Sequence, residues 1–225
     1  MRASVKAFIQ ARMSSRRYPG KVLAPFRGEP IIRHVIRAVE TALPRPDLVV
    51  VTSTHPTDDP LVHYLQAIGI QVFRGPLDNV LQRFLLCLQS HSCEWVLRIN
   101  GDSPLLWREL IQLFVRRSEQ FTGDLITTIS PRTFPRGQNA ELISAGALRT
   151  AAREAVVPED LEHVTPFFYR HPDRFRIMNI ESGNANLADA NLAVDTIEDL
   201  QRLEGLPAEE IHRLSPPILA SGVVS

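Results

Sequence analysis

The sequence is poor in cysteine. Two of its 225 residues are cysteines, and the spacing of Cys87 and Cys93 matches neither a zinc site nor a redox pair. We therefore expect reduced thiols, as in a cytosolic protein. Cys87 lies in the apolar run of residues 84–88, so we expect it to be a core residue.

The sequence also lacks a surplus of either charge and any long apolar run. Lys and Arg number 25, as do Asp and Glu, so no global electrostatic attraction to nucleic acid or an anionic membrane is expected. No apolar run approaches the ~18 residues of a membrane-spanning helix, and the first residues do not resemble a secretory signal. These absences predict a cytoplasmic globular protein with neither nucleic acid nor a membrane as partner.

Two common phosphate-binding fingerprints are missing as well. The sequence has no G-x-x-x-x-G-K-[ST], which is typical of P-loop proteins, and no G-x-G-x-x-G, which is typical of dinucleotide-binding folds. Both the kinase and the dehydrogenase interpretation are weakened.

What the sequence does have is a basic loop at residues 10–21, which follows a short alternating segment at residues 3–9. The loop contains no acid and ends in a Pro19-Gly20 turn signal. Its cationic side chains and small hydroxyl side chains are Arg12, Ser14, Ser15, Arg16, Arg17 and Lys21. Guanidinium groups bind phosphate oxygens in pairs and lysine adds a point charge, so we predict a phosphate-binding loop. From composition alone, a solvated basic loop remains the alternative.

The apolar pattern along the first part of the chain alternates between two periods. Helical spacing covers residues 30–43, 61–68, 79–90 and 106–121, and strand-like runs cover residues 48–52, 70–73, 95–99 and 124–129. This alternation predicts a mainly parallel sheet flanked by helices. Ligands of such sheets bind at the carboxyl ends of the strands, where the basic loop and residues 100–104 both lie.

The second part of the chain is less regular. We expect strands at residues 140–144 and 192–195 and helices at residues 145–155 and 159–170, with Thr196 capping a last helix through Leu203. The predicted organisation is a single domain over residues 1–206, followed by a C-terminal tail over residues 207–225. Within the domain we distinguish a first part, residues 1–129, from a second part, residues 130–206.

Two carboxylates at predicted strand ends are candidates for metal binding. Asp102 follows Gly101, which permits close backbone approach, and Asp195 ends an apolar run. Mg²⁺ takes one or two protein carboxylates together with phosphate oxygens and water, whereas an Asx-turn or helix cap is the commoner use of such an aspartate. Together with the basic loop, the two carboxylates suit group transfer from a nucleoside triphosphate.

The basic loop, extended to residue 23, resembles the signature loop of the sugar-acid cytidylyltransferases. Six further segments are similar to that family in order and spacing: residues 52–54, 72–75, 78–84, 98–105, 162–166 and 192–200. The resemblance covers roughly residues 4–203. It is greatest to the spore-coat-polysaccharide (SpsF-like) branch, which is related to the acylneuraminate and Kdo cytidylyltransferases.

The resemblance implies a Rossmann-like nucleotidyltransferase fold of the glycosyltransferase-A-like type. It implies an enzyme that uses CTP and Mg²⁺ to activate a sugar or sugar acid as its CMP derivative, with release of pyrophosphate, for surface polysaccharide. Residues 1–129 would bind the nucleotide and residues 130–206 the sugar. Members are often homodimers, to which residues 130–180 contribute.

The resemblance also implies roles for individual residues. Arg12, Lys21 and Asp102 would be catalytic, with Ser15 and Arg17 beside the triphosphate. Base and ribose contacts would come from Gln10, Ala11, Thr52, Ser53 and Arg83. Asp102 and Asp195 would bind the metal, and Glu141 and His163 the sugar.

Two positions depart from the family pattern. Asn139 stands where an aspartate is usual, which puts sugar choice and activity in doubt, and Arg16 replaces a small polar residue. His163 could instead make a structural hydrogen bond. Two alternatives therefore stay open: a nucleotidyltransferase that uses another nucleoside triphosphate or acceptor, and a nucleotide-binding homologue without catalysis.

Overall fold

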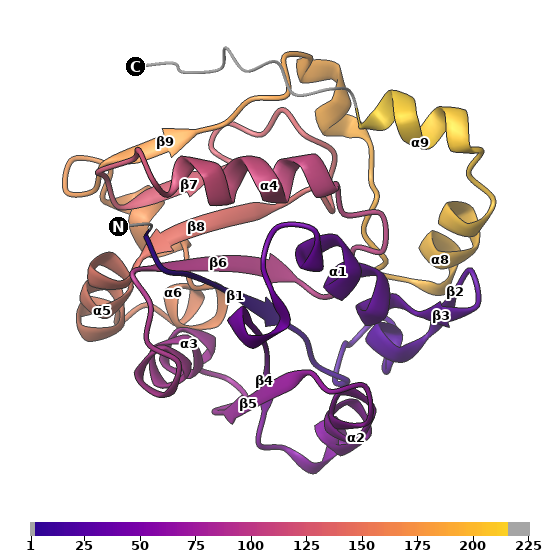
Figure 1. The fold of residues 1–225 in the computed structure, drawn as a ribbon, viewed down its shortest axis with the longest axis horizontal. Helices are drawn as coiled ribbons and strands as arrows, with labels where there is room; N and C mark the ends of the chain where they lie inside the picture. Colours follow the sequence, from indigo (N-terminus) through magenta and orange to yellow (C-terminus); the bar gives the residue numbers. More distant parts are fainter. Residues whose placement is uncertain (1–2, 216–225) are drawn as a thin grey trace.

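The computed structural model describes residues 3–215, and its centre is a sheet of seven strands in the order β5-β4-β1-β6-β8-β7-β9 (Figure 1). Four neighbouring strands are parallel: β5 (Gln71–Gly75), β4 (Leu48–Ser53), β1 (Val5–Gln10) and β6 (Trp95–Asn100). β8 (Ala140–Ser144) runs antiparallel to both β6 and β7 (Leu125–Thr127), and β9 (Ile177–Asn179) is parallel to β7. The prediction of a mainly parallel sheet flanked by helices is confirmed.

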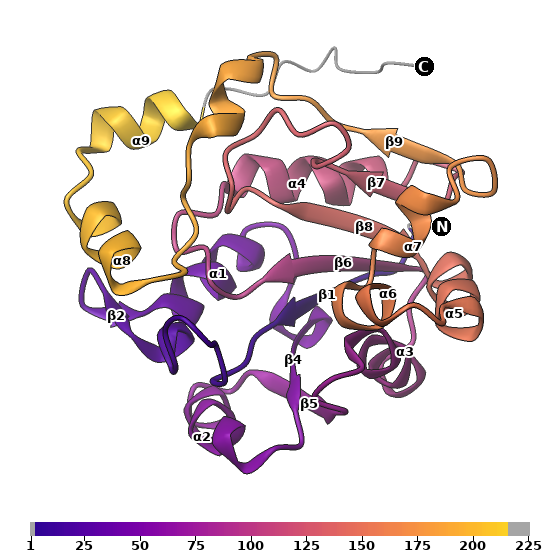
Figure 2. The same ribbon diagram turned by 180° about the vertical axis from the view of Figure 1, so that it is seen from behind.

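Side chains alternate across the central strands and so create a core on each face of the sheet. In β1, Ala7 and Ile9 pack in one core, and Phe8 packs in the other. The first core is covered by α1 (Ile31–Glu40), α2 (Asp59–Ala67) and α4 (Arg108–Arg117). The second is covered by α3 (Val80–Ser90), α5 (Ala145–Glu154), α6 (Pro158–His163) and α7 (Pro166–Arg170), seen from behind in Figure 2. Cys87 is buried in this second core, as predicted.

A third cluster lies at one end of the molecule. The hairpin of β2 (Pro25–Phe26) and β3 (Glu29–Pro30) packs there against α8 (Ile197–Glu204). Leu192 and Val194 are fully buried in the same cluster. The short 3₁₀ helices are η1 (Lys21–Leu23), η2 (Arg45–Asp47), η3 (Pro56–Asp58) and η4 (Ala185–Asp189).

Two of the predicted elements are wrong. Residues 159–170 form two helices, α6 and α7, because Val164 has a φ of 68° and so leaves helical geometry, and because Pro166, the first residue of α7, has no N–H with which to continue the hydrogen bonding of α6. Residues 192–195 form no strand; only Asn191 makes an isolated bridge, to Arg136. The apolar run is instead buried by the third cluster, so burial on its own did not require a sheet.

The predicted C-terminal tail, residues 207–225, is described by the structure only as far as residue 215. Within the part expected as a tail, residues Ala208–Leu214 form a helix, α9. The remainder of that prediction, residues 216–225, lies outside the described residues. Thr196 caps α8 as predicted, since its side chain accepts from the Asp199 backbone and the Asp199 side chain accepts in return.

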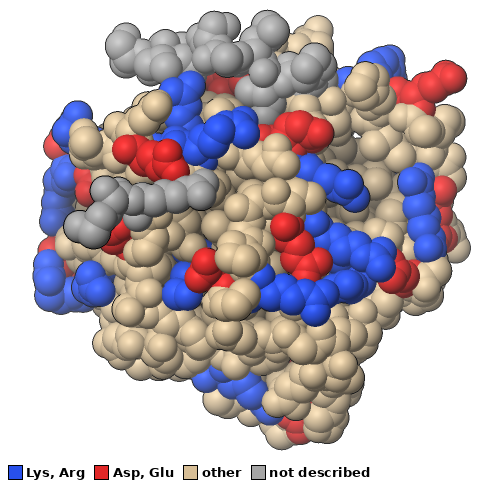
Figure 3. Space-filling view, in the orientation of Figure 1, with Lys and Arg blue, Asp and Glu red and all other residues tan. Residues whose placement is uncertain are grey.

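Charged side chains of both signs are interspersed on the face shown in Figure 3, which matches the zero formal net charge of the chain. Among residues 3–215, no helix combines the length and the apolar character needed to cross a membrane.

The order of the strands brings the two predicted ligand loops together. From β1 the chain moves to β4 on one side, and it later returns to place β6 on the other side. Such a switch point leaves a crevice outside the carboxyl ends of the strands. Gln10 and Asn100, the last residues of β1 and β6, are paired in register, so the basic loop and residues 100–104 leave the sheet side by side.

Candidate active site

A cavity of about 420 Å³ lies at the carboxyl ends of β1 and β6. Nine of the predicted site residues line it: Gln10, Ala11, Arg12, Ser15, Arg17, Lys21, Asp102, His163 and Asp195. The other four, Thr52, Ser53, Arg83 and Glu141, do not appear among its lining residues. The other lining residues are Arg16, which belongs to the predicted phosphate-binding loop, and five residues for which no role was predicted: Val22, Val80, Arg98, Asn100 and Glu162.

The basic loop turns back on itself so that Lys21 points into this cavity. Gly20 has a φ of 79°, a left-handed conformation that glycine adopts without strain, and its backbone N–H donates to the Met13 carbonyl at 2.8 Å. η1 begins directly afterwards at Lys21, which is only 8% exposed. The Pro-Gly signal thus corresponds to the turn that buries the lysine.

The ammonium group of Lys21 joins the two predicted metal ligands. Its Nζ donates to Asp102 Oδ2 at 2.8 Å, to Asp195 Oδ1 at 3.0 Å and to the Val194 carbonyl at 2.7 Å. Arg17 forms an ion pair with the other oxygen of Asp195 at 2.8 Å. Two cations of the basic loop therefore neutralise two carboxylates that lie 93 positions apart in the sequence.

Besides the bridge through Lys21, a backbone hydrogen bond rather than strand pairing brings the segment of Asp195 to Asp102. The Val194 N–H donates to the Asp102 carbonyl at 2.9 Å, which fixes the segment before Asp195 against the end of β6. Gly101, directly before Asp102, packs closely against Ile32 and Ala11 because it has no side chain. A Cβ at that position would lie 2.9 Å from the side chain of Ile32 and 3.0 Å from that of Ala11, closer than real Cβ atoms tolerate without a shift.

Thr52 and Ser53 lie beneath the basic loop, where both are fully buried. They hold the carboxylate of Asp58, which accepts from Thr52 Oγ1 at 2.9 Å and from both the hydroxyl and the backbone N–H of Ser53. Its other oxygen accepts from the Met13 backbone N–H at 2.7 Å, within the basic loop. Burial alone would raise the pKa of Asp58, but these hydrogen bonds outweigh it and the pKa is lowered. Thr52 and Ser53 therefore contact the loop indirectly.

The role of Asp58 was not predicted from the sequence. Residues 57–60 indicate the start of a helix, and α2 does begin there at Asp59, directly after η3, yet the Asp58 side chain makes no capping hydrogen bond. Its partner Met13 lies 45 positions away, and no local pattern indicates that pairing.

Arg83 is buried behind the basic loop. Its Nη2 donates to the Leu77 carbonyl at 2.9 Å, and its Nε has no hydrogen-bond partner within residues 3–215. Burial, together with the nearby charge of Arg12, lowers the pKa of Arg83 to about 10. Arg83 thus adds positive potential beneath the loop without lining the cavity.

Glu141 is part of a buried network on the opposite side of the cavity. Its side chain is 1% exposed and is paired with Arg98, and it accepts from the Tyr169 hydroxyl at 2.6 Å. Arg98 also donates to Gln10 Oε1 at 3.0 Å, at the cavity wall. Burial and the adjacent Glu141 charge raise the pKa of Tyr169. Glu141 is therefore placed to orient Gln10 through Arg98 rather than to touch a ligand directly.

Asn139 and Arg16, the two residues that depart from the family pattern, have different surroundings. Asn139 Oδ1 accepts from Arg132 Nη1 at 2.6 Å, so an amide rather than a charge faces that guanidinium. Arg16 lines the cavity, as does Glu162, which lies 4.0 Å from Arg12. His163 lines the cavity at the end of α6.

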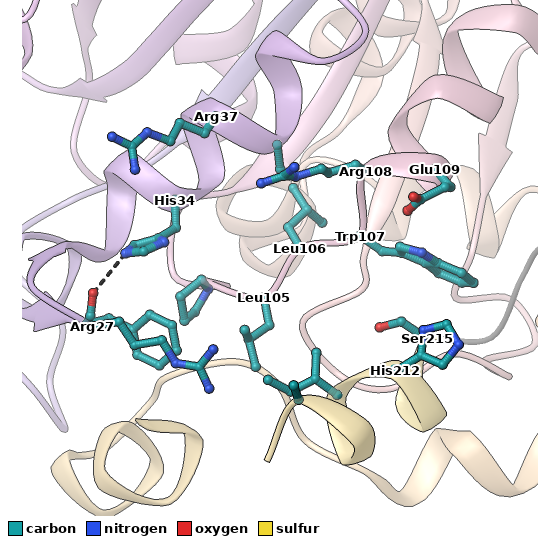
Figure 4. A pocket seen from close by; sticks show the side chains of 15 residues that line it. Arg27, His34, Arg37, Leu105, Leu106, Trp107, Arg108, Glu109, His212 and Ser215 are labelled. Atoms are coloured by element: carbon teal, nitrogen blue, oxygen red, sulfur yellow. Dashed lines mark hydrogen bonds between the residues drawn. The ribbon is translucent and has the colours of Figure 1, made fainter. Parts of the chain in front are cut away.

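A second and larger cavity, of about 560 Å³, lies between the β2–β3 hairpin, α1, residues 104–109 and α9 (Figure 4). Two of its cations are already engaged: Arg37 is paired with Glu29, and Arg27 donates to the Leu206 carbonyl at 3.0 Å. Among the described residues that line it, Glu109 is the single acid. The described lining of this larger cavity has no pair of carboxylates comparable to Asp102 and Asp195, so the smaller cavity is the better candidate.

Comparison with known proteins gives the site a context. The sequence model of a cytidylyltransferase family matches residues 7–215. The spore coat polysaccharide biosynthesis protein SpsF of Bacillus subtilis is 29% identical over 223 residues, covering 96% of this chain and 91% of that protein. A 3-deoxy-manno-octulosonate cytidylyltransferase of Paraburkholderia phytofirmans is 27% identical, covering 96% of this chain and 88% of its own.

Among solved structures, a cytidylyltransferase from Leptospira borgpetersenii superposes with a TM-score of 0.86 at 26% identity. The match covers 95% of this chain and 92% of that one. The expected nucleotidyltransferase fold is thereby confirmed. Since the family model spans nearly all of the described residues, the chain belongs to the cytidylyltransferase family and is a nucleotidyltransferase.

Proposed function

We propose that this enzyme transfers CMP from CTP to a sugar or sugar acid, releasing pyrophosphate, in the biosynthesis of a surface polysaccharide. The observation that carries the proposal is the convergence of Lys21 and Arg17 with Asp102 and Asp195 in one cavity at a topological switch point. The names of SpsF and the 3-deoxy-manno-octulosonate cytidylyltransferase support a sugar acceptor.

The two cavity carboxylates fit Mg²⁺, which prefers carboxylate and phosphate oxygens. Within residues 3–215, no group of three or more His, Cys, Asp or Glu side chains could hold a metal ion. We therefore propose that Asp102 and Asp195 hold the ion and that phosphate oxygens complete its coordination. When bound, the ion would lower the charge on the phosphates and polarise them for attack.

The basic loop would bind the triphosphate and stabilise the leaving group. In the proposed reaction a sugar hydroxyl oxygen bonds to the α-phosphorus, the bond from that phosphorus to the bridging oxygen breaks, and pyrophosphate departs. Arg12, Arg17 and Lys21 line the cavity, and in this proposal they would neutralise the charge that develops on pyrophosphate. The hydroxyl proton is released to solvent in the overall balance.

Residues 1–129 would bind the nucleotide and residues 130–206 the sugar. Because Arg98 donates to the Oε1 atom of Gln10, the amide nitrogen is the atom of this side chain that would donate to a base acceptor. From the second part, Glu162, His163 and Asp195 all line the cavity. We propose that Glu162 and His163 contact the sugar, with Ala11 and Ser15 lining the nucleotide side.

Product formation tests the proposal. The protein is incubated with Mg²⁺, each of the four nucleoside triphosphates and a panel of sugars and sugar acids, and mass spectrometry detects nucleotide-linked sugars. We expect a CMP-linked product from CTP alone. A product from another triphosphate would assign a different nucleotidyltransferase activity, and saturable CTP binding without any product would favour the non-catalytic alternative.

We further propose a cytoplasmic homodimer. Val156 and Val157, between α5 and α6, are 82% and 43% exposed, and they lie in the region expected to form the dimer contact. The free thiols of Cys87 and Cys93 are in keeping with a reducing compartment. Light scattering should give the mass of a dimer for the wild type, and V156D/V157D should give that of a monomer.

A further inference from the structure

The ammonium group of Lys21 has no donor left for a phosphate. It has three N–H groups, and all three are used by Asp102, Asp195 and the Val194 carbonyl at 2.7–3.0 Å. At 8% exposure, Lys21 is also nearly inaccessible to solvent. In this conformation Lys21 holds the two carboxylates together.

The charges around this ammonium group are already balanced. Asp102 and Asp195 contribute two negative charges, and Lys21 and Arg17 contribute two positive ones. A divalent ion added to this arrangement would leave two uncompensated positive charges in a partly buried site, which is costly. A triphosphate supplies the negative charge that restores the balance.

The number of protein ligands also indicates that a divalent ion needs the triphosphate in order to bind here. In the part of the chain that the structure describes, no three acidic, histidine or cysteine side chains come close enough together to hold a metal ion. Mg²⁺ requires near-octahedral coordination, so two carboxylates alone make an incomplete site, even before the competing lysine is considered.

From these observations we infer that Lys21 occupies the position of a cation between Asp102 and Asp195 in the nucleotide-free protein, and that it must release both carboxylates before they can bind a divalent ion. Its flexible four-carbon stem allows the ammonium group to move from the carboxylates to the incoming phosphates. Metal ion and triphosphate would therefore bind as a coupled pair, each raising the affinity for the other. The coupling to CTP rests on the proposed function.

The test measures Mn²⁺ binding to the nucleotide-free protein by electron paramagnetic resonance, with Mn²⁺ as the probe. In K21M the side-chain length is nearly kept while the competing charge is removed. We expect K21M to bind Mn²⁺ about tenfold or more tightly than the wild type. Addition of CTP should raise the Mn²⁺ affinity of the wild type by a larger factor than that of K21M.

Two controls identify the cause of such a gain. R16M removes a cation from the same loop and cavity without touching either carboxylate, and it should change Mn²⁺ affinity by about threefold or less. K21M/D195N should lose the gain, because one of the released ligands is then gone. Equal gains in R16M and K21M would contradict the inference, as would an unchanged affinity in K21M.

Folding of K21M gives a second readout. Without the ammonium group the two carboxylates repel, so K21M should unfold at a lower temperature in EDTA and recover on addition of Mn²⁺. Loss of stability without recovery would overturn the inference. So would equal Mn²⁺ affinity of the wild type with and without CTP, a measurement that needs no variant.

Failure of the inference can be told apart from failure of the proposed function. If the wild type forms no CMP-linked product, the proposed function fails, while Mn²⁺ binding to nucleotide-free K21M still decides the role of Lys21. If product forms and K21M binds Mn²⁺ no better than the wild type, only the inference about Lys21 fails.

Discussion

The molecule uses carboxylates near its cavity in two different ways. The side chains of Asp102 and Asp195 are 25% and 35% exposed. Their partners are Lys21 and Arg17, two cations of the basic loop. Asp58 and Glu141 are 0% and 1% exposed, and their partners come from the loop and strands around the cavity. The comparison teaches that burial separates the acids that can meet a ligand from those that hold the cavity walls.

The largest expected effect comes from a cavity carboxylate. D195N removes a proposed metal ligand and a partner of Lys21 and Arg17 while keeping the shape of the side chain. We expect kcat to fall by about 10²–10³-fold, with little change in thermal stability. Steady-state kinetics and thermal unfolding of the same preparation check both expectations. A near-normal kcat would show that Asp195 is not a ligand of the catalytic metal ion.

Substitution of a buried carboxylate should instead reduce stability more than kcat. D58A leaves the backbone N–H of Met13 and the donors of Thr52 and Ser53 without their acceptor. We expect a loss of about 3 kcal/mol in the free energy of unfolding and a raised KM for CTP, because the basic loop loses its attachment. Urea denaturation measures the first effect; unchanged stability would show that Asp58 does not hold the loop.

The same residue predicts a pH dependence. The pKa of Asp58 is lower in the folded protein than in the unfolded chain, so its contribution to stability is present above the unfolded value and is lost as pH falls through the folded one. Below about pH 4 the wild type should therefore lose stability more steeply than D58N. Parallel acid-unfolding curves for the two proteins would contradict this assignment.

The smallest effect is expected on the other wall of the cavity. Y169F removes a hydroxyl that donates to Glu141 and contacts Thr127, but leaves the Glu141–Arg98 pair intact. We expect a loss of about 1 kcal/mol in stability and a modest rise in KM for CTP through the position of Gln10. A large fall in kcat with unchanged KM would instead place Tyr169 in contact with the reacting groups.

Local patterns predicted the regular part of the fold well. The strand that became β4 is a β-branched run, and the helix after Thr196 begins with a hydroxyl that caps it, so both signals lie within a few residues. The basic loop was predicted for the same reason, since its cations and its Pro-Gly turn are adjacent in sequence.

The remaining features depend on partners distant in the sequence. The run of residues 192–195 is buried by the hairpin and α8 and is fixed by the Asp102 carbonyl, so its apolar pattern was mistaken for a strand. The attachment of the basic loop to Asp58 depends on Met13, 45 positions away, and the pairing of Glu141 depends on Arg98, 43 positions away. None of these pairings leaves a signal in a short window.

The central claim is that the cavity at the strand ends transfers CMP from CTP. The most direct test is pyrophosphate release with CTP, Mg²⁺ and the sugar panel, comparing the wild type with D102N. We predict release that depends on CTP and on one class of sugar, and that falls by about 10²-fold or more in D102N. Equal release from the two proteins would contradict the assignment of this cavity.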